Sequence, residues 1–139
     1  MARPFAQFAG VLFVLIGVAG FFTGDASHVN SGQAGGNFDG VALHLTYLRD
    51  VINVLLGAGF AYAGWFPRGR NPRTAVIALG CVLLVLAIIG FALQDDDAGT
   101  RSIATLHFPL AMNILDLVAG VFAVLSGLGD VAEPSAASA

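Results

Sequence analysis

Long apolar runs alternate with short polar segments along the chain. The four runs cover roughly residues 5–22, 41–66, 74–93 and 106–128. Each is close to the ~20 residues that a helix needs to cross a hydrocarbon layer of ~30 Å. The first and third runs contain no charged position, whereas a helix of a soluble bundle keeps a polar stripe. The pattern therefore predicts an all-α integral membrane four-helix bundle, with residues 1–139 forming a single transmembrane domain.

The composition agrees with this prediction. Hydrophobic residues make up 57% of the chain and charged residues 11%, compared with about 25% charged residues in an average globular protein. The net charge of −3 is too small and too scattered to indicate a nucleic acid partner. The lipid bilayer is the partner that the composition predicts.

The charges between the runs predict an orientation. Three arginines lie in residues 67–73, and Arg3 precedes the first run. The other two connections are acidic or neutral apart from Arg101. Because arginine-rich segments stay in the cytoplasm, we expect a multi-pass plasma membrane protein with both termini cytoplasmic. Residues 129–139 are predicted to form a disordered cytoplasmic tail.

The second half of the chain repeats the first. The spacing from Gly10 to Gly20 recurs 70 residues later as Gly80 to Gly90. The second and fourth runs share a Leu-His pair, two Asp or Asn positions and a glycine, at an offset of 63 residues. We therefore predict two helical hairpins related by an internal repeat and a two-fold axis along the membrane normal. The second and fourth helices are expected to meet near this axis.

Polar residues within the apolar runs are the first candidates for a site, because they are costly in a bilayer and usually face the bundle interior. The candidate cluster consists of Arg49, Asp50, Asn53, Asn113 and Asp116. Small residues continue the same stripes along both helices, so we expect the two stripes to face each other. Pairing Arg49 with Asp116, with both asparagines as hydrogen-bond partners, would offset much of the cost of burial. The cluster is either a static clasp or an ion- or proton-linked site that opens outward.

His44 and His107 occupy equivalent positions in the repeat. Two such histidines could hold a metal or ligate haem, but their position at the ends of helices favours a cap or a loop hydrogen bond. No nucleophile lies in a recognisable catalytic motif, and no glycine loop for phosphate is present. We therefore predict a non-catalytic protein with no cofactor and no metal.

Three stretches resemble an uncharacterised family of small four-helix bacterial membrane proteins, known as domain of unknown function 4383. They are residues 10–21, 48–57 and 113–120, and the resemblance extends over roughly residues 5–128. It implies the fold and a bacterial membrane location, but no activity. Family members often carry histidines on the second and fourth helices, where this chain has Arg49, Asn53 and Asp116. This departure from the family pattern argues against carrying over any histidine chemistry of the family to these positions.

Three functional hypotheses follow. The first is a structural or accessory membrane protein, either a supernumerary subunit of a larger complex, for example a respiratory one, or a homo-oligomer. The second is a small ion-, proton- or solute-handling protein that uses Asp116, Arg49 and Asp50. The third is a redox component associated with haem or quinone through His44 and His107.

Overall fold

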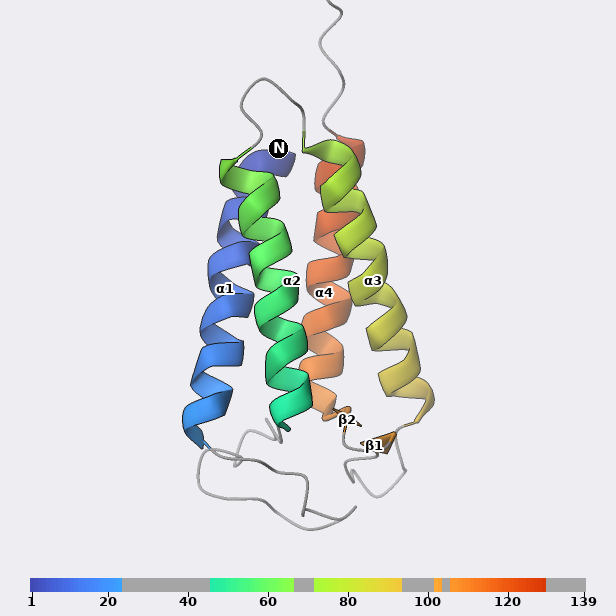
Figure 1. The fold of residues 1–139 in the computed structure, drawn as a ribbon. Coiled ribbons are helices and arrows are strands. Elements are labelled where there is room, and N and C mark those ends of the chain that lie inside the picture. The colour runs from blue at the N-terminus through green and yellow to red at the C-terminus, as the bar shows by residue number, and fades with distance from the viewer. Residues whose placement is uncertain (24–45, 67–71, 94–101, 104–105, 130–139) are drawn as a thin grey trace, which may run out of the picture.

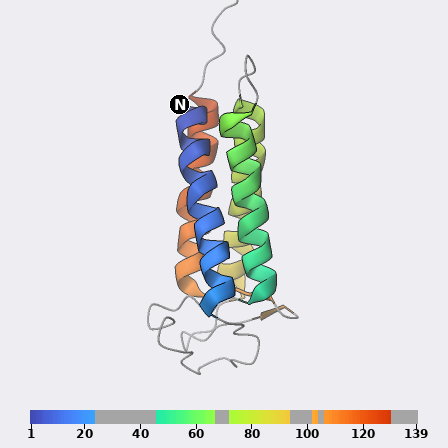
Figure 2. The ribbon, with the colours of Figure 1, turned by 60° about the vertical axis from the view of Figure 1, so that its left-hand side comes forward.

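The bundle predicted from the sequence is present in the computed structural model, which describes residues 1–23, 46–66, 72–93, 102–103 and 106–129. The helices in these ranges are α1 (Ala2–Thr23), α2 (Tyr47–Trp65), α3 (Arg73–Ala92) and α4 (Leu110–Leu128). Two short strands, β1 (Ser102–Ile103) and β2 (Leu106–His107), pair antiparallel shortly before α4. The helices run alternately down and up along one common direction (Figures 1 and 2). The fold class is confirmed.

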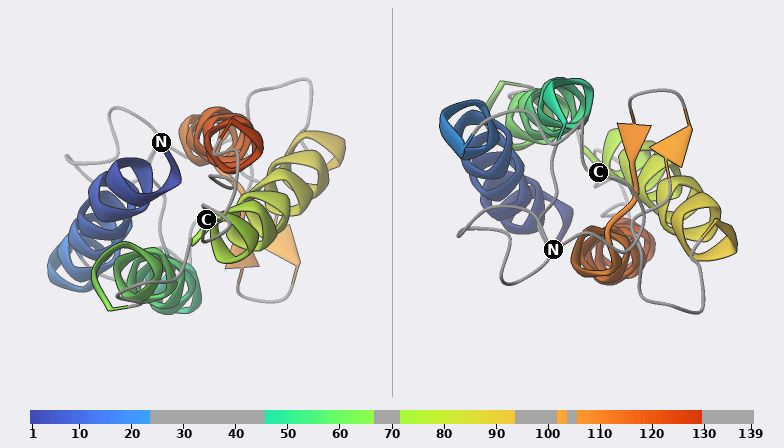
Figure 3. Two further views of the ribbon diagram at one scale, coloured as in Figure 1. Left: turned by 90° about the horizontal axis from the view of Figure 1, so that it is seen from above. Right: turned by 90° about the horizontal axis from the view of Figure 1, so that it is seen from below.

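The helices form two hairpins, α1 with α2 and α3 with α4, which lie side by side when viewed along the bundle (Figure 3). A Cβ atom added at Gly57 would lie 2.5 Å from the backbone nitrogen of Val14. A Cβ atom at Gly120 would lie 2.9 Å from Leu84, which occupies the position of Val14 in the second half. Both ends of α4 also follow those of α2 by 63 residues. The predicted repeat is confirmed.

The expectation that the two small-residue stripes face each other is wrong. Gly57 packs on α1, and Gly120 packs on Gly80 and Leu84 of α3. Gly64 likewise lies against Gln7, whose side-chain amide donates to the Gly64 carbonyl at 3.2 Å. Small residues let two backbones approach closely. Here the small residues lie at the contact between the two helices of the same hairpin.

Two helices begin later than expected. Thr46 has an extended backbone and caps α2, with its hydroxyl accepting from the Arg49 N–H at 3.3 Å. The rest of the expected extension, residues 41–45, lies outside the described residues. The fourth helix begins at Leu110 rather than at residue 106, because Pro109 is extended at its N-cap and residues 106–107 form β2. A residue before proline is also disfavoured in the helical region.

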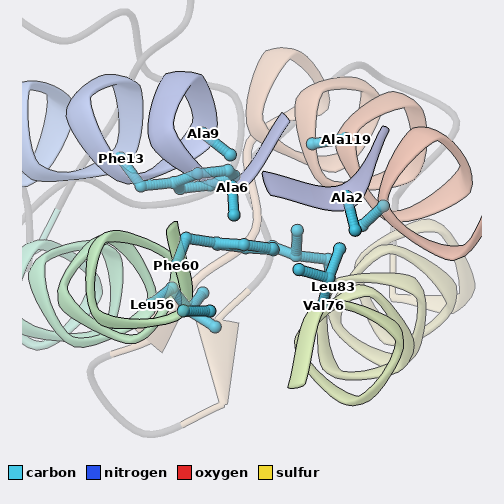
Figure 4. Close-up of a cluster of buried hydrophobic side chains, with 11 residues drawn as sticks. Ala2, Ala6, Ala9, Phe13, Leu56, Phe60, Val76, Leu83 and Ala119 are labelled. Carbon is cyan, nitrogen blue, oxygen red and sulfur yellow. The ribbon is translucent and has the colours of Figure 1, made fainter. Parts of the chain in front are cut away.

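Aromatic and aliphatic side chains fill the middle of the bundle. Phe13 and Phe60 stack with their ring centroids 6.3 Å apart. Val76 and Leu83 of α3 belong to the same buried cluster (Figure 4). Among the described residues this core is apolar and packed, and it separates the polar cluster near the starts of α2 and α4 from the opposite end of the bundle.

Three of the four described helices, α1, α3 and α4, are long and apolar enough to cross a membrane. The exception is α2, which carries Arg49, Asp50 and Asn53, all of them fully buried. The outer face of α2 exposes Leu55 and Tyr62 instead. The lower hydropathy of this helix therefore comes from its inward face.

Candidate functional site: a buried polar cluster

The centre of the site is an ion pair between the two hairpins. The Arg49 guanidinium, in the first turn of α2, donates through Nη2 to Oδ2 of Asp116, about two turns into α4. Both side chains have no exposed surface. The pairing expected from the sequence is therefore present, and it links two helices that otherwise pack mainly on their own hairpin partners.

Two glycines accommodate the neighbouring polar side chains. The carboxylate of Asp50 lies where a Cβ atom of Gly20 would stand, and the amide of Asn113 lies where a Cβ atom of Gly90 would stand. Gly20 and Gly90 are equivalent in the repeat, as are Asp50 and Asn113. Each polar side chain is thus directed toward α1 or α3. Gly20 and Gly90 also belong to the glycine spacing that revealed the repeat, so the sequence already marked the two positions where these polar side chains lie.

The expectation that both asparagines hydrogen-bond to the ion pair is wrong. Asn113 donates its amide to the carbonyl oxygen of Phe108 at 3.2 Å, not to the ion pair. Asn53 is fully buried, and neither its Oδ1 nor its Nδ2 has a hydrogen-bond partner among the described residues. The Phe108 contact could not be predicted, because it depends on the path of the backbone between β2 and α4.

The ion pair itself leaves polar atoms without partners. Within the described part of the chain, Nε and Nη1 of Arg49, Oδ1 of Asp116 and Oδ1 of Asn113 make no hydrogen bond. The ring of Phe108, itself buried, covers the guanidinium at 6.0 Å from ring centroid to Cζ. Buried polar groups are normally satisfied, so this combination marks the cluster as the candidate site.

The internal two-fold reveals an asymmetry in the cluster. At the offset of 63 residues, Asn53 corresponds to Asp116, and Arg49 corresponds to Met112. All four side chains are buried. The hairpins therefore offer two equivalent crossing positions, and only one of them carries charges. Met112 was not singled out from the sequence, although the repeat contained its signal.

The two candidate histidines of the sequence are His44 and His107. His44 lies outside the described residues, and His107 belongs to β2 at the end of the bundle. The N-cap positions of α2 and α4 are taken by Thr46 and Pro109. In the described ranges, no group of three or more His, Cys, Asp or Glu side chains is arranged to hold a metal.

A second feature is an apolar groove of about 360 Å³ between α1 and α4. Phe5 and Phe8 of α1 and Phe122 of α4 contribute to its lining, together with Ala9 and Ala119. On the opposite side of the bundle, Leu79 of α3 packs against Gly59 of α2. In the repeat, Leu79 corresponds to Ala9 and Gly59 corresponds to Phe122. The side with the groove therefore differs in shape from the side where Leu79 meets Gly59.

Comparison with known proteins identifies a family. No curated protein and no solved structure matches the chain. The sequence profile of one family, described as a domain of unknown function (DUF4383), matches residues 3–129. This range contains α2, α3, α4, all of α1 except its first residue, and the complete polar cluster. The chain belongs to the DUF4383 family of uncharacterised domains.

Proposed function

We propose that this protein is a non-catalytic structural or accessory protein of the bacterial plasma membrane. It acts through its apolar outer surface, which packs against subunits of a larger membrane complex or against further copies of the same chain. The polar cluster serves this function as a clasp that keeps the two hairpins in one arrangement.

One observation carries the proposal, namely the division between a polar interior and an apolar exterior. The charged and amide side chains of the cluster are directed inward and have no exposed surface. The exposed large side chains of all four helices include Phe8, Leu55, Ile88 and Phe122. In a bilayer, helices associate through packing and through a few interhelical hydrogen bonds. An outer surface of this kind can bind lipid or another membrane helix without exposing a charge.

Purification in a mild detergent, followed by native mass spectrometry, tests the proposal. We expect the chain to co-purify with other membrane subunits in fixed ratio, or to form an oligomer of defined size. A Phe8→Ala and Phe122→Ala double variant should weaken that assembly, whereas Ile88→Ala, on the outer face of α3, serves as the matched control. A strictly monomeric protein with no partner would contradict the proposal.

The proposed location also requires a defined orientation. The arginines of residues 67–73 and Arg3 favour cytoplasmic termini. Two variants in a Cys81→Ser background test it with an impermeant maleimide applied to intact cells. Ser138→Cys should resist labelling, and Gly99→Cys should react. The opposite labelling pattern would reverse the orientation.

A second candidate function, the handling of a small ion or solute, is favoured by the polar atoms of Arg49, Asn53 and Asp116 that lack partners among the described residues. The packed core around Phe13, Phe60 and Leu83 favours a site that opens toward one side over a continuous path through the bundle.

A further inference from the structure

We propose that the buried polar atoms around the Arg49–Asp116 pair bind a small, neutral, hydrogen-bonding ligand, either water molecules or a small polar solute with an amide-like group. This inference goes beyond the accessory role, because it assigns a ligand to the interior of the bundle. It does not depend on which partner covers the exterior.

The polar cluster contains both donors and acceptors that lack hydrogen-bond partners. Among the described residues, the donors without partners are Nε and Nη1 of Arg49 and Nδ2 of Asn53. The acceptors without partners are Oδ1 of Asn53, Oδ1 of Asn113 and Oδ1 of Asp116. The four side chains have no exposed surface. A buried donor or acceptor left unsatisfied destabilises the protein, so the arrangement favours an occupant that both donates and accepts.

Atoms without partners from both hairpins lie at the ion pair. Because Arg49 and Asp116 share one hydrogen bond, the second terminal nitrogen of the guanidinium and the second oxygen of the carboxylate lie beside the same contact. Asn53 is four residues beyond Arg49 on α2, and residues at this spacing share one helix face. The amide of Asn113 is directed toward Gly90 of α3 instead. The atoms that a ligand would meet therefore belong to Arg49 and Asn53 of one hairpin and to Asp116 of the other.

The charges at the proposed site favour a neutral ligand. The guanidinium of Arg49 and the carboxylate of Asp116 neutralise each other, and both asparagines are neutral. The carboxylate of Asp50 is directed toward Gly20 of α1, and Asp50 also has an interaction partner. An isolated ion is expensive to bury in a low-dielectric interior, so a neutral ligand fits this site better than a cation or an anion.

The side chains around the site leave one direction from which a ligand would enter. Leu56, Phe60 and Leu83 are buried in the part of the bundle toward the ends of α2 and α4. In the other direction, near the starts of these helices, the buried Phe108 ring covers the guanidinium. Asn113 holds the backbone of this residue through its carbonyl oxygen. A ligand would therefore reach the site past Phe108.

Nuclear magnetic resonance of the full chain, labelled with ¹⁵N at arginine and asparagine in detergent micelles, tests the proposal. The Arg49 Nε–H signal is identified as the one lost in the Arg49→Met and Asp116→Asn double variant. We expect a cross-peak between this N–H and water, or a saturable shift of the N–H signal on titration with acetamide as the neutral probe. The first result assigns water as the occupant, and the second assigns a solute. The absence of both in the folded protein would overturn the site.

Two variants test the site and its access. Asn53→Leu removes one donor and one acceptor and should abolish or weaken the water or acetamide response at Arg49. Phe108→Ala keeps the polar atoms and should speed solvent exchange of the Arg49 N–H several-fold. If Asn53→Leu does not fold, Phe108→Ala still decides, because unchanged exchange would refute access past this ring. A saturable response to sodium chloride alone would refute the neutral ligand.

Discussion

At the scale of single residues, the most consequential contact is the ion pair between Arg49 and Asp116. Both groups are fully buried, so each depends on the other for compensation of its charge. Removing one partner of a buried pair leaves a charge without compensation, whereas replacing both partners by groups of similar volume is often neutral or stabilising. The repeat supplies such replacements, because Met112 and Asn53 stand at the equivalent positions.

This asymmetry gives the first prediction. Asp116→Asn leaves the Arg49 charge buried alone and should lower the free energy of unfolding by about 3–5 kcal/mol. The matched control combines Asp116→Asn with Arg49→Met, which copies the pair of side chains found at the other crossing position. This double variant should recover most of the loss. Unfolding by sodium dodecyl sulfate in mixed micelles, followed by circular dichroism, measures both. Equal stability of the two variants would show that Arg49 needs no counter-ion.

At the scale of helices, contact within each hairpin is governed by glycine. A Cβ atom at Gly57 would meet backbone and side-chain atoms of Val14, at 2.5 and 2.7 Å. A Cβ atom at Gly59, on the same helix, would meet only the end of the Leu79 side chain, at 3.1 Å. A backbone cannot move without shifting a whole helix, whereas a leucine end can rotate. The two glycines should therefore respond differently to the same substitution.

The second prediction uses this contrast. Gly57→Ala should destabilise the protein by roughly 1–3 kcal/mol, as overpacking typically does. Gly59→Ala should be close to neutral, because alanine favours the helix by about 1 kcal/mol relative to glycine and this gain offsets the tight Leu79 contact. The same unfolding assay compares the two variants. A larger loss for Gly59→Ala would contradict the helix packing described here.

At the scale of the whole molecule, the protein is two similar hairpins joined by an asymmetric clasp. The two-fold maps Arg49 onto Met112 and Asp116 onto Asn53. A salt bridge placed at the second crossing position should therefore connect the same two helices with equivalent geometry. The repeat itself does not favour either position for this pair.

The third prediction moves the clasp. The variant Arg49→Met, Asn53→Asp, Met112→Arg and Asp116→Asn should fold with a stability within about 1–2 kcal/mol of the parent, because buried residues exchange places with their structural equivalents. The matched control carries only Asn53→Asp and Asp116→Asn. It moves the carboxylate without moving the arginine, and it should unfold far more easily. Similar stability of the two variants would contradict the two-fold equivalence.

Much of the fold follows from the sequence alone, for physical reasons that can be stated. Apolar runs long enough to cross a bilayer predict helices, and the glycine spacings predict the repeat, because both depend only on periodicity along the chain. The Arg49–Asp116 pair was also predictable. Few charges lie within the apolar runs, and opposite charges in a low-dielectric medium need each other.

Tertiary structure decided which neighbour each helix face meets. Periodicity places Gly57 and Asn53 on one side of α2, but it does not tell whether α1 or α4 lies there. The starts of α2 and α4 depended on the extended backbone of Thr46 and Pro109 at the N-cap positions. The bond from Asn113 to Phe108 depended on the path of the backbone between β2 and α4. The sequence therefore determined the helices, the repeat and the charge pair. Only packing in three dimensions decided that small residues close each hairpin while the ion pair joins the two, because contact depends on which helices are adjacent.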